Sequence, residues 1–252
     1  MTTDAPDLAV VRVLEETTFA SWPDLAHERL DGWLLRFAAG HTKRANSVNV
    51  LEPRPEGLAE RIAEAERRYR GAGLRPVFRL TPLAEPELDA LLDARGYGVV
   101  EPSLVKTAPM PAGTATHPSV RLASKPDGGW LDGYTLAAGL DETGRTTLRA
   151  MLARIDGIPV YAMVEDAGMP QAFAMAVVHE GRVGFFDVLT LPQARRRGMA
   201  RRIMESLITW SRDDAGARSL WIQVVAANTP ARNLYRALGF ATRYGYHYRV
   251  AR

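Results

Sequence analysis

Five arginines crowd around a single glycine in the stretch "TLPQARRRGMARRIMESLITW" (residues 190–210). They are Arg195, Arg196, Arg197, Arg201 and Arg202, and Gly198 lies between them. Apolar residues at helical spacing follow Gly198, so a helix is expected to begin there. The start of a helix carries a partial positive charge and favours acids. Arginines at this place therefore indicate either an anion that is bound over them or cations that extend into water.

Phosphate binding is the chemistry that this stretch could support. Backbone N–H groups at the start of a helix have no partner within the helix and point toward a ligand beyond its end. Gly198 lets the backbone approach a ligand closely, and Ala200 keeps the first turn unobstructed. Each hydrogen bond to a charged group contributes about 1.5–3 kcal/mol. A few such bonds outweigh the unfavourable position of the arginines.

The neighbouring segments place this loop between a strand and a helix. "PVYAMVED", "QAFAMAVVHEG" and "RVGFFDVLTLP" predict an antiparallel meander of three strands. One face of the helix that follows is predicted from apolar spacing: Ala200, Ile203, Met204, Leu207, Ile208 and Ser211. "SLWIQVV" (residues 219–225) predicts a strand, and "NTPARNLYRALGF" predicts a short helix that Thr229 can cap. "YGYHYRV" predicts a last strand.

The two halves of the chain show a similar order of predicted strands and helices. They lie on either side of "TAPMPAGTATHP" (residues 107–118), which is rich in Pro, Ala and Thr. We expect an N-terminal lobe at 1–107, a linker at 108–118 and a C-terminal domain at 119–252. Gly73 and Gly96 are separated by the same interval as Gly216 and Gly239. The first half also has a helical apolar face: Leu58, Ile62, Ala65 and Tyr69. The repeat predicts a diverged duplication, with the arginine-rich loop in the second half alone.

Two motifs of the second half resemble the signatures of the GNAT N-acetyltransferase superfamily. The acyl-CoA loop pattern R/Q-x-x-G-x-G/A is matched from Arg195 to Ala200. The second pattern, N-x-x-A-x-x-x-Y-x-x-x-G-F, is matched by Asn228, Ala231, Tyr235, Gly239 and Phe240. The resemblance implies an α/β (α+β) fold with tandem GNAT-like lobes. Each lobe would have a mixed, mostly antiparallel twisted sheet, flanking helices and splayed central strands, and the N-terminal lobe would be a degenerate copy.

The resemblance also implies acetyl-CoA as the co-substrate and a set of residues that bind it. Main-chain groups of Leu189, Thr190 and Leu191 would pair with the pantetheine arm. The pyrophosphate would lie on the loop formed by Arg195, Arg196, Arg197, Gly198, Met199, Ala200 and Arg201. Asn228 would hydrogen-bond the pantetheine amides, with a helix N-cap as its alternative or additional role. Tyr235 would be the general acid for the leaving thiolate, or else a packing residue.

The residue that acts as the general base is harder to assign from the sequence. In relatives similar to the ribosomal-protein alanine acetyltransferases, a glutamate on the fifth strand is the base, but this chain has Gln223 there, which cannot take a proton. Asp187 in "FFDVLTLP" is the candidate, because many superfamily members carry an acid near this place. An acid among apolar strand residues could instead satisfy a backbone neighbour, and a chain of water molecules is the other route for the proton.

Composition limits the other classes of function. The chain has 252 residues, a net charge of +3 and no cysteine, which excludes disulfides and thiolate chemistry and fits a cytoplasmic protein. No apolar run approaches the roughly 20 residues that span a bilayer. The five histidines lack metal-ligand spacing, so no metal is expected. The arginine-rich stretch "QARRRGMARR" has no interleaved aromatic residue, so nucleic acid is not favoured as a partner.

We therefore expect an acetyl-CoA-dependent N-acetyltransferase that transfers an acetyl group to a primary amine by direct attack in a ternary complex. The acceptor, a small molecule or a protein, stays open, and so does the choice between monomer and homodimer. The alternative is a GNAT-like module without catalysis that senses acyl-CoA or binds a partner.

Overall fold

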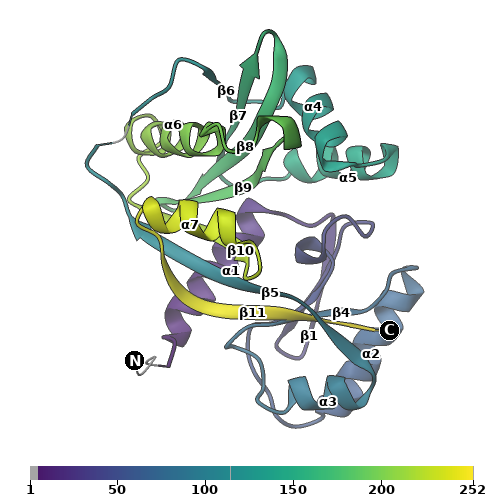
Figure 1. The fold of residues 1–252 in the computed structure, drawn as a ribbon. Coiled ribbons are helices and arrows are strands. Elements are labelled where there is room, and N and C mark those ends of the chain that lie inside the picture. The colour runs from purple at the N-terminus through teal and green to yellow at the C-terminus, as the bar shows by residue number, and fades with distance from the viewer. Residues whose placement is uncertain (1–4, 114, 252) are drawn as a thin grey trace.

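A computed structural model describes residues 5–113 and 115–251 as one twisted sheet with helices packed against it (Figure 1). The α-helices are α1 (Leu8–Ser21), α2 (Leu58–Gly71), α3 (Leu88–Ala94), α4 (Gly128–Ala138), α5 (Glu142–Leu152), α6 (Met199–Asp213) and α7 (Thr229–Ala237). Short 3-10 helices, η1 (Lys43–Ala45) and η2 (Pro192–Ala194), precede β3 and α6. The strands are β1 (Ala26–Leu30), β2 (Trp33–Phe37), β3 (Val48–Val50), β4 (Val77–Leu80), β5 (Tyr97–Pro109), β6 (Val120–Ala123), β7 (Ile158–Asp166), β8 (Met169–His179), β9 (Arg182–Thr190), β10 (Ser219–Val225) and β11 (Ala241–Ala251).

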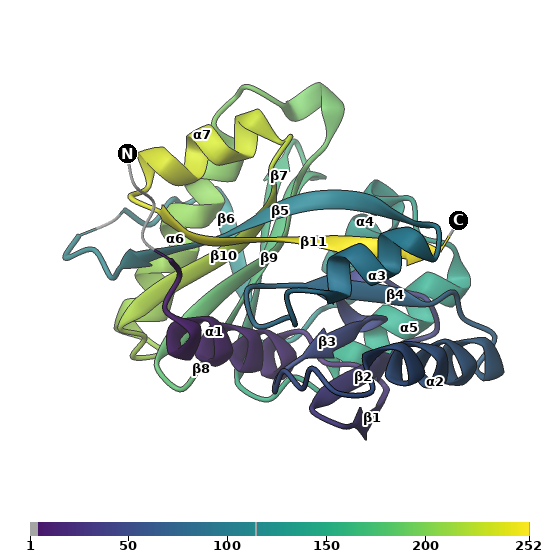
Figure 2. The same ribbon diagram turned by 90° about the horizontal axis from the view of Figure 1, so that it is seen from below.

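The two halves of the chain exchange their last strands in the middle of the sheet. The strand order is β1-β2-β3-β4-β11-β5-β10-β9-β8-β7-β6. Strand β5, which ends the first half, pairs with β10 of the second half, and β11 pairs with β4 of the first half. The two exchanged strands also pair with each other, and they run side by side through the centre in Figures 1 and 2. Each half therefore completes the sheet of the other.

Most of the local predictions for the second half are confirmed. Strands β7, β8 and β9 form the antiparallel meander, and β10 has the predicted bounds. Helix α6 buries its predicted face except for Ala200, which is half-buried, and α2 in the first half buries all of its predicted face. The prediction that Thr229 caps α7 is wrong, and the N-cap role given to Asn228 as an alternative is confirmed. Asn228 is the N-cap, because its Oδ1 accepts from the N–H of Ala231 at 3.2 Å, whereas Thr229 already lies inside the helix.

The junction between the halves lies later than the sequence predicts. Strand β5 continues to Pro109, past the predicted end of the first lobe at residue 107. Val105 and Ala108 are buried in this strand, so it belongs to the core rather than to a connecting segment. From 110 to 118, the residues that the structure describes form no helix or strand.

The helices cover both faces of the sheet. Helices α6 and α7 lie on one side and α1 on the other, as Figure 2 shows. The first face is packed by Ile203, Leu207 and Leu220, among others, and the second joins Trp22 of the first half to Trp130 and Phe173 of the second. A third cluster fills the first half around α2. In the described part of the chain, no helix is both long enough and apolar enough to cross a membrane.

Candidate active site

A gap opens in the sheet where β9 and β10 part. The two strands are parallel neighbours only over residues 182–185 and 219–222. Strand β9 continues to Thr190 and β10 to Val225, without pairing to each other beyond that point. The splayed central strands that the resemblance implies are therefore present in the second half. Their facing edges leave main-chain groups that a ligand can reach.

The edge of β9 at the gap is kinked by a β-bulge. The pairing of β8 with β9 shifts register, so that Asp187 and Val188 together lie opposite Ala174. Asp187 has a φ of 53°, a left-handed conformation that Asp adopts more readily than most residues. A bulge bends its strand and redirects a side chain. The bulge thus turns the carboxylate of Asp187 away from the ordinary alternation of the strand.

The alternation of main-chain groups after the bulge decides which residue faces the gap. The N–H of Leu191 donates to the carbonyl of Gln171 on the β8 side at 2.9 Å. Because successive residues of a strand point their N–H and C=O groups to opposite edges, those of Thr190 face the gap. Arg195 donates from Nε to the carbonyl of Thr190 at 3.3 Å. Of Leu189, Thr190 and Leu191, which are predicted to pair with a pantetheine arm, Thr190 is the one whose main-chain groups face the gap.

The loop before α6 presents a run of unpaired N–H groups. Arg196 has a φ of 60°, and Gly198, the residue before α6, has a φ of 77°. From Arg196 to Arg201, none of the backbone N–H groups donates a hydrogen bond to any residue that the structure describes. A Cβ at Gly198 would meet only open space. These groups and the positive end of the helix form a cradle for an anion.

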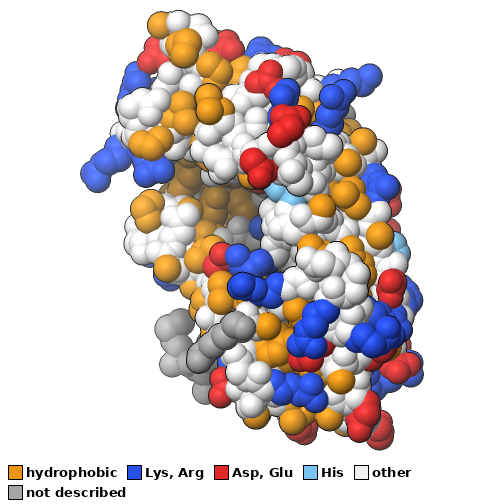
Figure 3. Space-filling model, turned by 90° about the vertical axis from the view of Figure 1, so that its right-hand side faces the viewer, with side chains coloured by type: hydrophobic (Ala, Val, Ile, Leu, Met, Phe, Trp, Pro, Cys, Tyr) orange, Lys and Arg blue, Asp and Glu red, His pale blue; other side chains and the backbone are white. Residues whose placement is uncertain are grey.

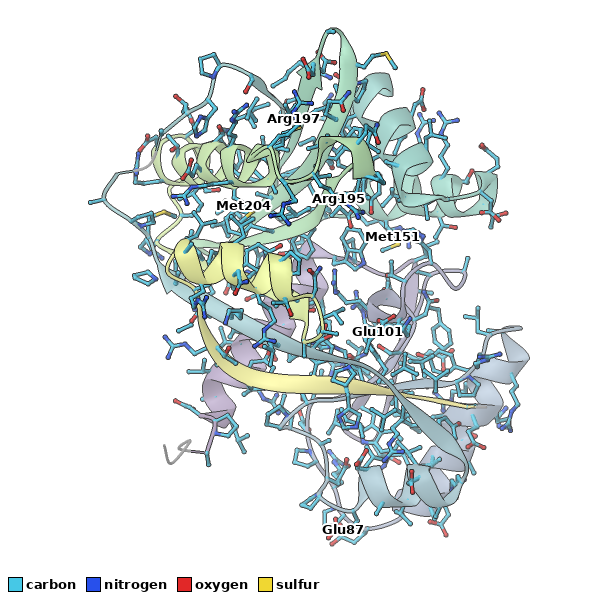
Figure 4. All side chains as sticks on the ribbon, in the orientation of Figure 1. Glu87, Glu101, Met151, Arg195, Arg197 and Met204 are labelled. Carbon is cyan, nitrogen blue, oxygen red and sulfur yellow. The ribbon has the colours of Figure 1, made fainter. Side chains whose placement is uncertain are left out.

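The arginine side chains of this loop differ in their partners. Arg197 forms an ion pair with Asp166 at 2.7 Å, and Arg201 forms one with Glu205 at 2.8 Å. Arg196 and Arg202 have no ion pair with a described residue. In Figure 4, Arg195 lies at the end of the loop nearer α7, and Arg197 lies farther from it. Exposed ion pairs contribute about 0–1 kcal/mol, so the paired arginines can exchange their partners for a phosphate at little cost.

Helix α7 brings the second motif to the other side of the gap. Asn228 uses only its Oδ1 for the cap, and no described residue accepts a hydrogen bond from its Nδ2. Tyr235 is buried, and its ring meets that of Phe240 edge-on at 6.0 Å. Burial raises the pKa of Tyr235 to about 12, so the phenol keeps its proton at neutral pH. A protonated phenol is the form that a general acid needs.

The surface is hollowed at the height of this gap. Figure 3 shows the hollow, with hydrophobic side chains on its floor and Lys or Arg side chains at its rim. This is the surface that a long, partly apolar molecule with anionic groups would require.

Asp187 is a carboxyl group with an unusually weak acidity. Burial raises its pKa from 3.8 to about 6, although the hydroxyl of Tyr134 and the guanidinium of Arg44 oppose this shift. Its Oδ2 is buried without a hydrogen-bond partner among the described residues. A group whose pKa lies close to neutral can both hold and release a proton, as a general base must.

Helix α4 holds Tyr134 beside this carboxyl group. Trp130 stacks on Tyr134 with 5.1 Å between the ring centres, and its Nε1 donates to the carbonyl of Ala162 at 3.1 Å. Gly133 makes room for Phe173, since a Cβ at that position would come within 2.7 Å of the Phe173 ring. The burial of Tyr134 and the nearby Asp187 both raise the pKa of its hydroxyl, which therefore remains a donor.

Gln223 is held as a structural link between the halves. Its Nε2 donates to Oγ1 of Thr18 in α1 at 3.0 Å, and its Oε1 accepts from the hydroxyl of Tyr246 at 3.0 Å. Both ends of the amide are used. The residue at the place of the glutamate base is thus a neutral amide whose two polar ends are already hydrogen-bonded.

The sequence did not single out Arg44, Tyr134 or Tyr246. Arg44 comes from the first half, Tyr134 from α4 and Tyr246 from the exchanged strand β11, and each lies in a segment without a motif. Only the strand exchange brings these segments together. A buried charge or phenol far away in the chain leaves no local signal.

The first half contains a counterpart of the loop before α6, and a buried carboxylate lies beside it. Gly57 precedes α2 with a φ of 63°, as Gly198 precedes α6. The buried Glu85 accepts from the backbone N–H of Arg54 at 3.1 Å and pairs with Arg61 at 2.9 Å. It also accepts from Nε1 of Trp33 at 3.0 Å. Glu85 takes up the N–H of Arg54 only, and the backbone N–H groups of residues 56–60 donate to no residue that the structure describes.

The two acid–base candidates lie on opposite faces of the sheet. Tyr235 belongs to the core beneath α6 and α7, whereas Asp187 lies near Tyr134 in the core beneath α1 and α4. The gap between β9 and β10 connects the faces. Within the described residues, no cluster of three or more His, Asp or Glu side chains is arranged to hold a metal ion.

Comparison with known sequences identifies the family. The family model described as "Probable histone acetyltransferase Rv0428c C-terminal" matches residues 8–249. Over 247 residues, the chain is 27% identical to the uncharacterized N-acetyltransferase YobR of Bacillus subtilis. The matched region covers 96% of this chain and 99% of that protein. It is also 34% identical over 73 residues to the [ribosomal protein bS18]-alanine N-acetyltransferase of Escherichia coli. That matched region covers 29% of this chain and 49% of that enzyme.

Solved structures show the same fold. A GCN5-related N-acetyltransferase from Kribbella flavida superposes with a TM-score of 0.70 at 14% identity, over 99% of this chain and 96% of that one. A tandem GNAT protein from the clavulanic acid biosynthesis pathway gives a TM-score of 0.63 at 12% identity, over 97% and 87% of the two chains. With a family model that spans both halves, the chain belongs to the family which that model describes, and it is an acyltransferase of the GNAT N-acetyltransferase type.

Proposed function

We propose that the protein transfers the acetyl group of acetyl-CoA to a primary amine in the gap between β9 and β10. The observation that carries this proposal is the position of the gap. It lies between an open cradle of N–H groups at residues 196–201 and the carboxyl group of Asp187, whose pKa is raised to about 6. One end of the gap is suited to a pyrophosphate and the other to a reacting amine.

The chain's own groups would hold the co-substrate along this gap. The N–H groups from Arg196 to Arg201 would bind the pyrophosphate, with the side chains of Arg196 and Arg202 close by. The main chain of Thr190 would pair with the pantetheine arm as an added strand, and Leu189 and Leu191 would contribute apolar contacts. Asn228 would donate from Nδ2 to a pantetheine carbonyl while its Oδ1 continues to cap α7.

Two proton transfers accompany the reaction. An alkylammonium group has a pKa near 10, so it must lose a proton before its nitrogen attacks the thioester carbonyl. Asp187 would take that proton on the α4 side of the sheet. The C–N bond forms, the C–S bond breaks, and Tyr235 would supply a proton to the departing sulfur on the α7 side. The products are an amide and the free thiol of CoA.

The first half would be a degenerate copy that braces the second. The arginine in the first turn of α2, Arg61, is buried and paired with Glu85, whereas Arg201 and Arg202 in the first turn of α6 are exposed, and this difference supports a single acetyl-CoA site in each chain. Its contribution to the site is the exchanged strand β5 and the loop that carries Arg44.

A non-catalytic acyl-CoA sensor is the second candidate, because Gln223 replaces the glutamate base. The raised pKa of Asp187 argues against it, since a binding module has no need for a carboxyl group that is shielded from water and titrates near neutral pH.

Release of the CoA thiol tests the proposal. Purified protein is mixed with acetyl-CoA and a panel of primary amines, and free thiol is followed by a chromogenic disulfide. Amine-dependent release that Asp187→Asn and Tyr235→Phe reduce, in proteins with wild-type circular dichroism, supports it. Tight acetyl-CoA binding without release for any amine would favour the sensor.

A further inference from the structure

Arg44 is half-buried, and it differs in its partners from the fully buried arginines of the chain. Arg36, Arg61, Arg79 and Arg249 each form an ion pair with a carboxylate. Among the described residues, Arg44 has no carboxylate within 4.0 Å, and its Nε is buried without a hydrogen-bond partner. Buried charges in proteins are normally paired, because an unpaired one carries a large cost of desolvation.

The surroundings of Arg44 keep its side chain charged. Its guanidinium lies over the rings of Trp22 and Phe186, at 5.7 and 5.8 Å from their centres. Burial opposes the charge, but Tyr246, Tyr248 and Asp187 outweigh it and raise the pKa of Arg44 above its ordinary value. Aromatic faces and phenols stabilise a cation without neutralising it. The side chain therefore presents a full positive charge to the space beside Asp187.

The loop that carries Arg44 is built at a cost in backbone strain. Ala39 and Thr42 have φ values of 49° and 58°. Strained residues of this kind cost about 1–3 kcal/mol each and persist only where the surroundings hold them. Asn46 holds this loop, because its Oδ1 accepts from the N–H groups of Ala38 and Gly40 at 2.7 and 3.0 Å. Its Nδ2 donates to the carbonyl of Thr42 at 2.9 Å.

Arg36 holds the backbone of Arg44 in place through a hydrogen bond. It is fully buried, and it donates to the carbonyl of Arg44 at 2.9 Å and to that of Trp22 at 2.6 Å. Asp24 supplies its counter-charge at 2.6 Å. One paired arginine thus holds both the backbone of Arg44 and the aromatic residue beneath its guanidinium.

A cavity of about 540 Å³ opens next to this loop, between the two halves. Residues 39–42 line one side, and Gly139, Leu140 and Asp141, from the connection between α4 and α5, line the other. Helix α4 also carries Tyr134, the neighbour of Asp187. The cavity is thus lined by the loop that leads to Arg44 and by the connection that follows α4, while Arg44, Tyr134 and Asp187 themselves do not line it.

We propose that Arg44 binds a carboxylate of the acceptor, so that the acceptor is a small amine that also carries a carboxylate group. This inference rests on the proposed acetyl transfer at Asp187. Asp187 is the carboxyl group that faces Arg44, and it becomes neutral when it takes the proton of the amine. A carboxylate on the acceptor supplies the missing counter-charge at that moment, and the fork of a guanidinium matches it in two parallel hydrogen bonds.

Matched pairs of acceptors test this assignment. Glycine, β-alanine and γ-aminobutyrate, each beside its primary amide, vary the distance between amine and carboxylate while the amide removes only the charge. With acetyl-CoA, wild-type kcat/KM is expected to favour the acid over the amide for at least one length. Arg44→Met is expected to lower kcat/KM for that acid by about 30-fold or more, because it removes one partner of a buried charge pair. Loss of Arg44 also changes the pKa of Asp187, and this affects the acid and the amide alike, so the decisive quantity is the ratio of kcat/KM for the acid to that for its amide, which should fall in the variant.

Lys43→Met is the control variant. Lys43 is the neighbour of Arg44 in η1 and carries the same charge, but it pairs with Glu101 at 2.8 Å on the surface. It should keep the wild-type preference for the acid. If Arg44→Met does not fold, Arg44→Lys keeps the charge but loses the fork, and its preference for the acid should fall severalfold. Equal rates with acid and amide in the wild type, or a preference that survives in the Arg44 variant, would overturn the inference.

Failure of the proposed reaction is distinguishable from failure of this inference. If no amine releases thiol, the same acid and amide pairs are titrated calorimetrically into protein saturated with CoA. Binding of the acid that exceeds binding of the amide, and that Arg44→Met removes, supports the carboxylate site without catalysis. Equal binding of acid and amide refutes it.

Discussion

Replacing Asp187 by Asn should make the protein more stable at neutral pH and nearly inactive. The substitution keeps the shape of the side chain and removes its charge, and Asn adopts the left-handed backbone of this position at least as readily as Asp. An asparagine behaves as a permanently neutral form of the carboxyl group. The expected gain is therefore the free energy that the folded wild type loses when it ionises Asp187 in a buried place.

The pKa values determine the size of that gain. The folded value is about 6 and the ordinary value is 3.8. At about 1.4 kcal/mol for each factor of ten in acidity, the difference corresponds to about 3 kcal/mol at pH 8. Between pH 6 and pH 4 the folded protein binds a proton that the unfolded chain does not. The wild type therefore regains stability as the pH falls through this window, and below pH 4 the two proteins should be nearly equal.

Urea unfolding followed by circular dichroism measures the free energy of unfolding of both proteins at pH 4, where they should be nearly equal, and at pH 8, where the difference should be largest. Asp31→Asn is the matched control, because Asp31 also has a positive φ, 42°, but lies exposed in the turn between β1 and β2. Its effect should be the same at both pH values. An Asp187→Asn variant that is less stable than the wild type at pH 8 would show that the carboxylate is well paired in the folded state. The account of Asp187 as a buried base would then be wrong.

The same titration should appear in catalysis. If Asp187 takes the proton of the amine, wild-type kcat/KM rises with pH through about 6, as the carboxyl group ionises in the free enzyme. The residual activity of Asp187→Asn should lack this rise. A rise that persists in the variant would assign the base to another group.

Three further substitutions test other parts of the account. Glu85→Gln leaves Arg61 buried without a counter-charge and should lower the free energy of unfolding by about 3–5 kcal/mol, measured in urea; a loss below about 1 kcal/mol would contradict it. Tyr235→Phe keeps the ring packed on Phe240 and should lower kcat by about 10²–10⁴-fold with little change in Tm; an unchanged kcat would make Tyr235 a packing residue. Asn228→Asp keeps the cap oxygen but removes the amide donor, so acetyl-CoA affinity should fall while thermal stability stays; equal affinity would leave Asn228 as a cap alone.

The sequence could predict the parts of the fold that depend on neighbouring residues. Strand β10 and helix α6 follow from apolar spacing over short windows, and the motif around Gly198 marks the start of α6. For the cap of α7 the sequence left both Asn228 and Thr229 open, because Asn and Thr are both good caps and only the position of the Ala231 amide separates them.

The strand exchange could not be predicted in this way. The residues of β5 do not determine which strand it pairs with, since an apolar strand pairs equally well with either lobe. The contact of Arg44 with the surroundings of Asp187 depends on that exchange, and so does the link from Gln223 to Tyr246. Asp187 was a candidate from its place in the strand, but its raised pKa comes from burial by residues far away in the chain.

The most direct test of the central claim is a calorimetric titration of the protein with acetyl-CoA, with the Gly198→Glu and Gly57→Glu variants beside it. Both glycines precede a helix with a positive φ, and a Cβ at either would meet open space, so the two substitutions carry similar strain. The account predicts one binding site per chain, lost in Gly198→Glu and kept in Gly57→Glu. Two sites per chain, or binding that Gly57→Glu removes and Gly198→Glu leaves unchanged, would contradict it.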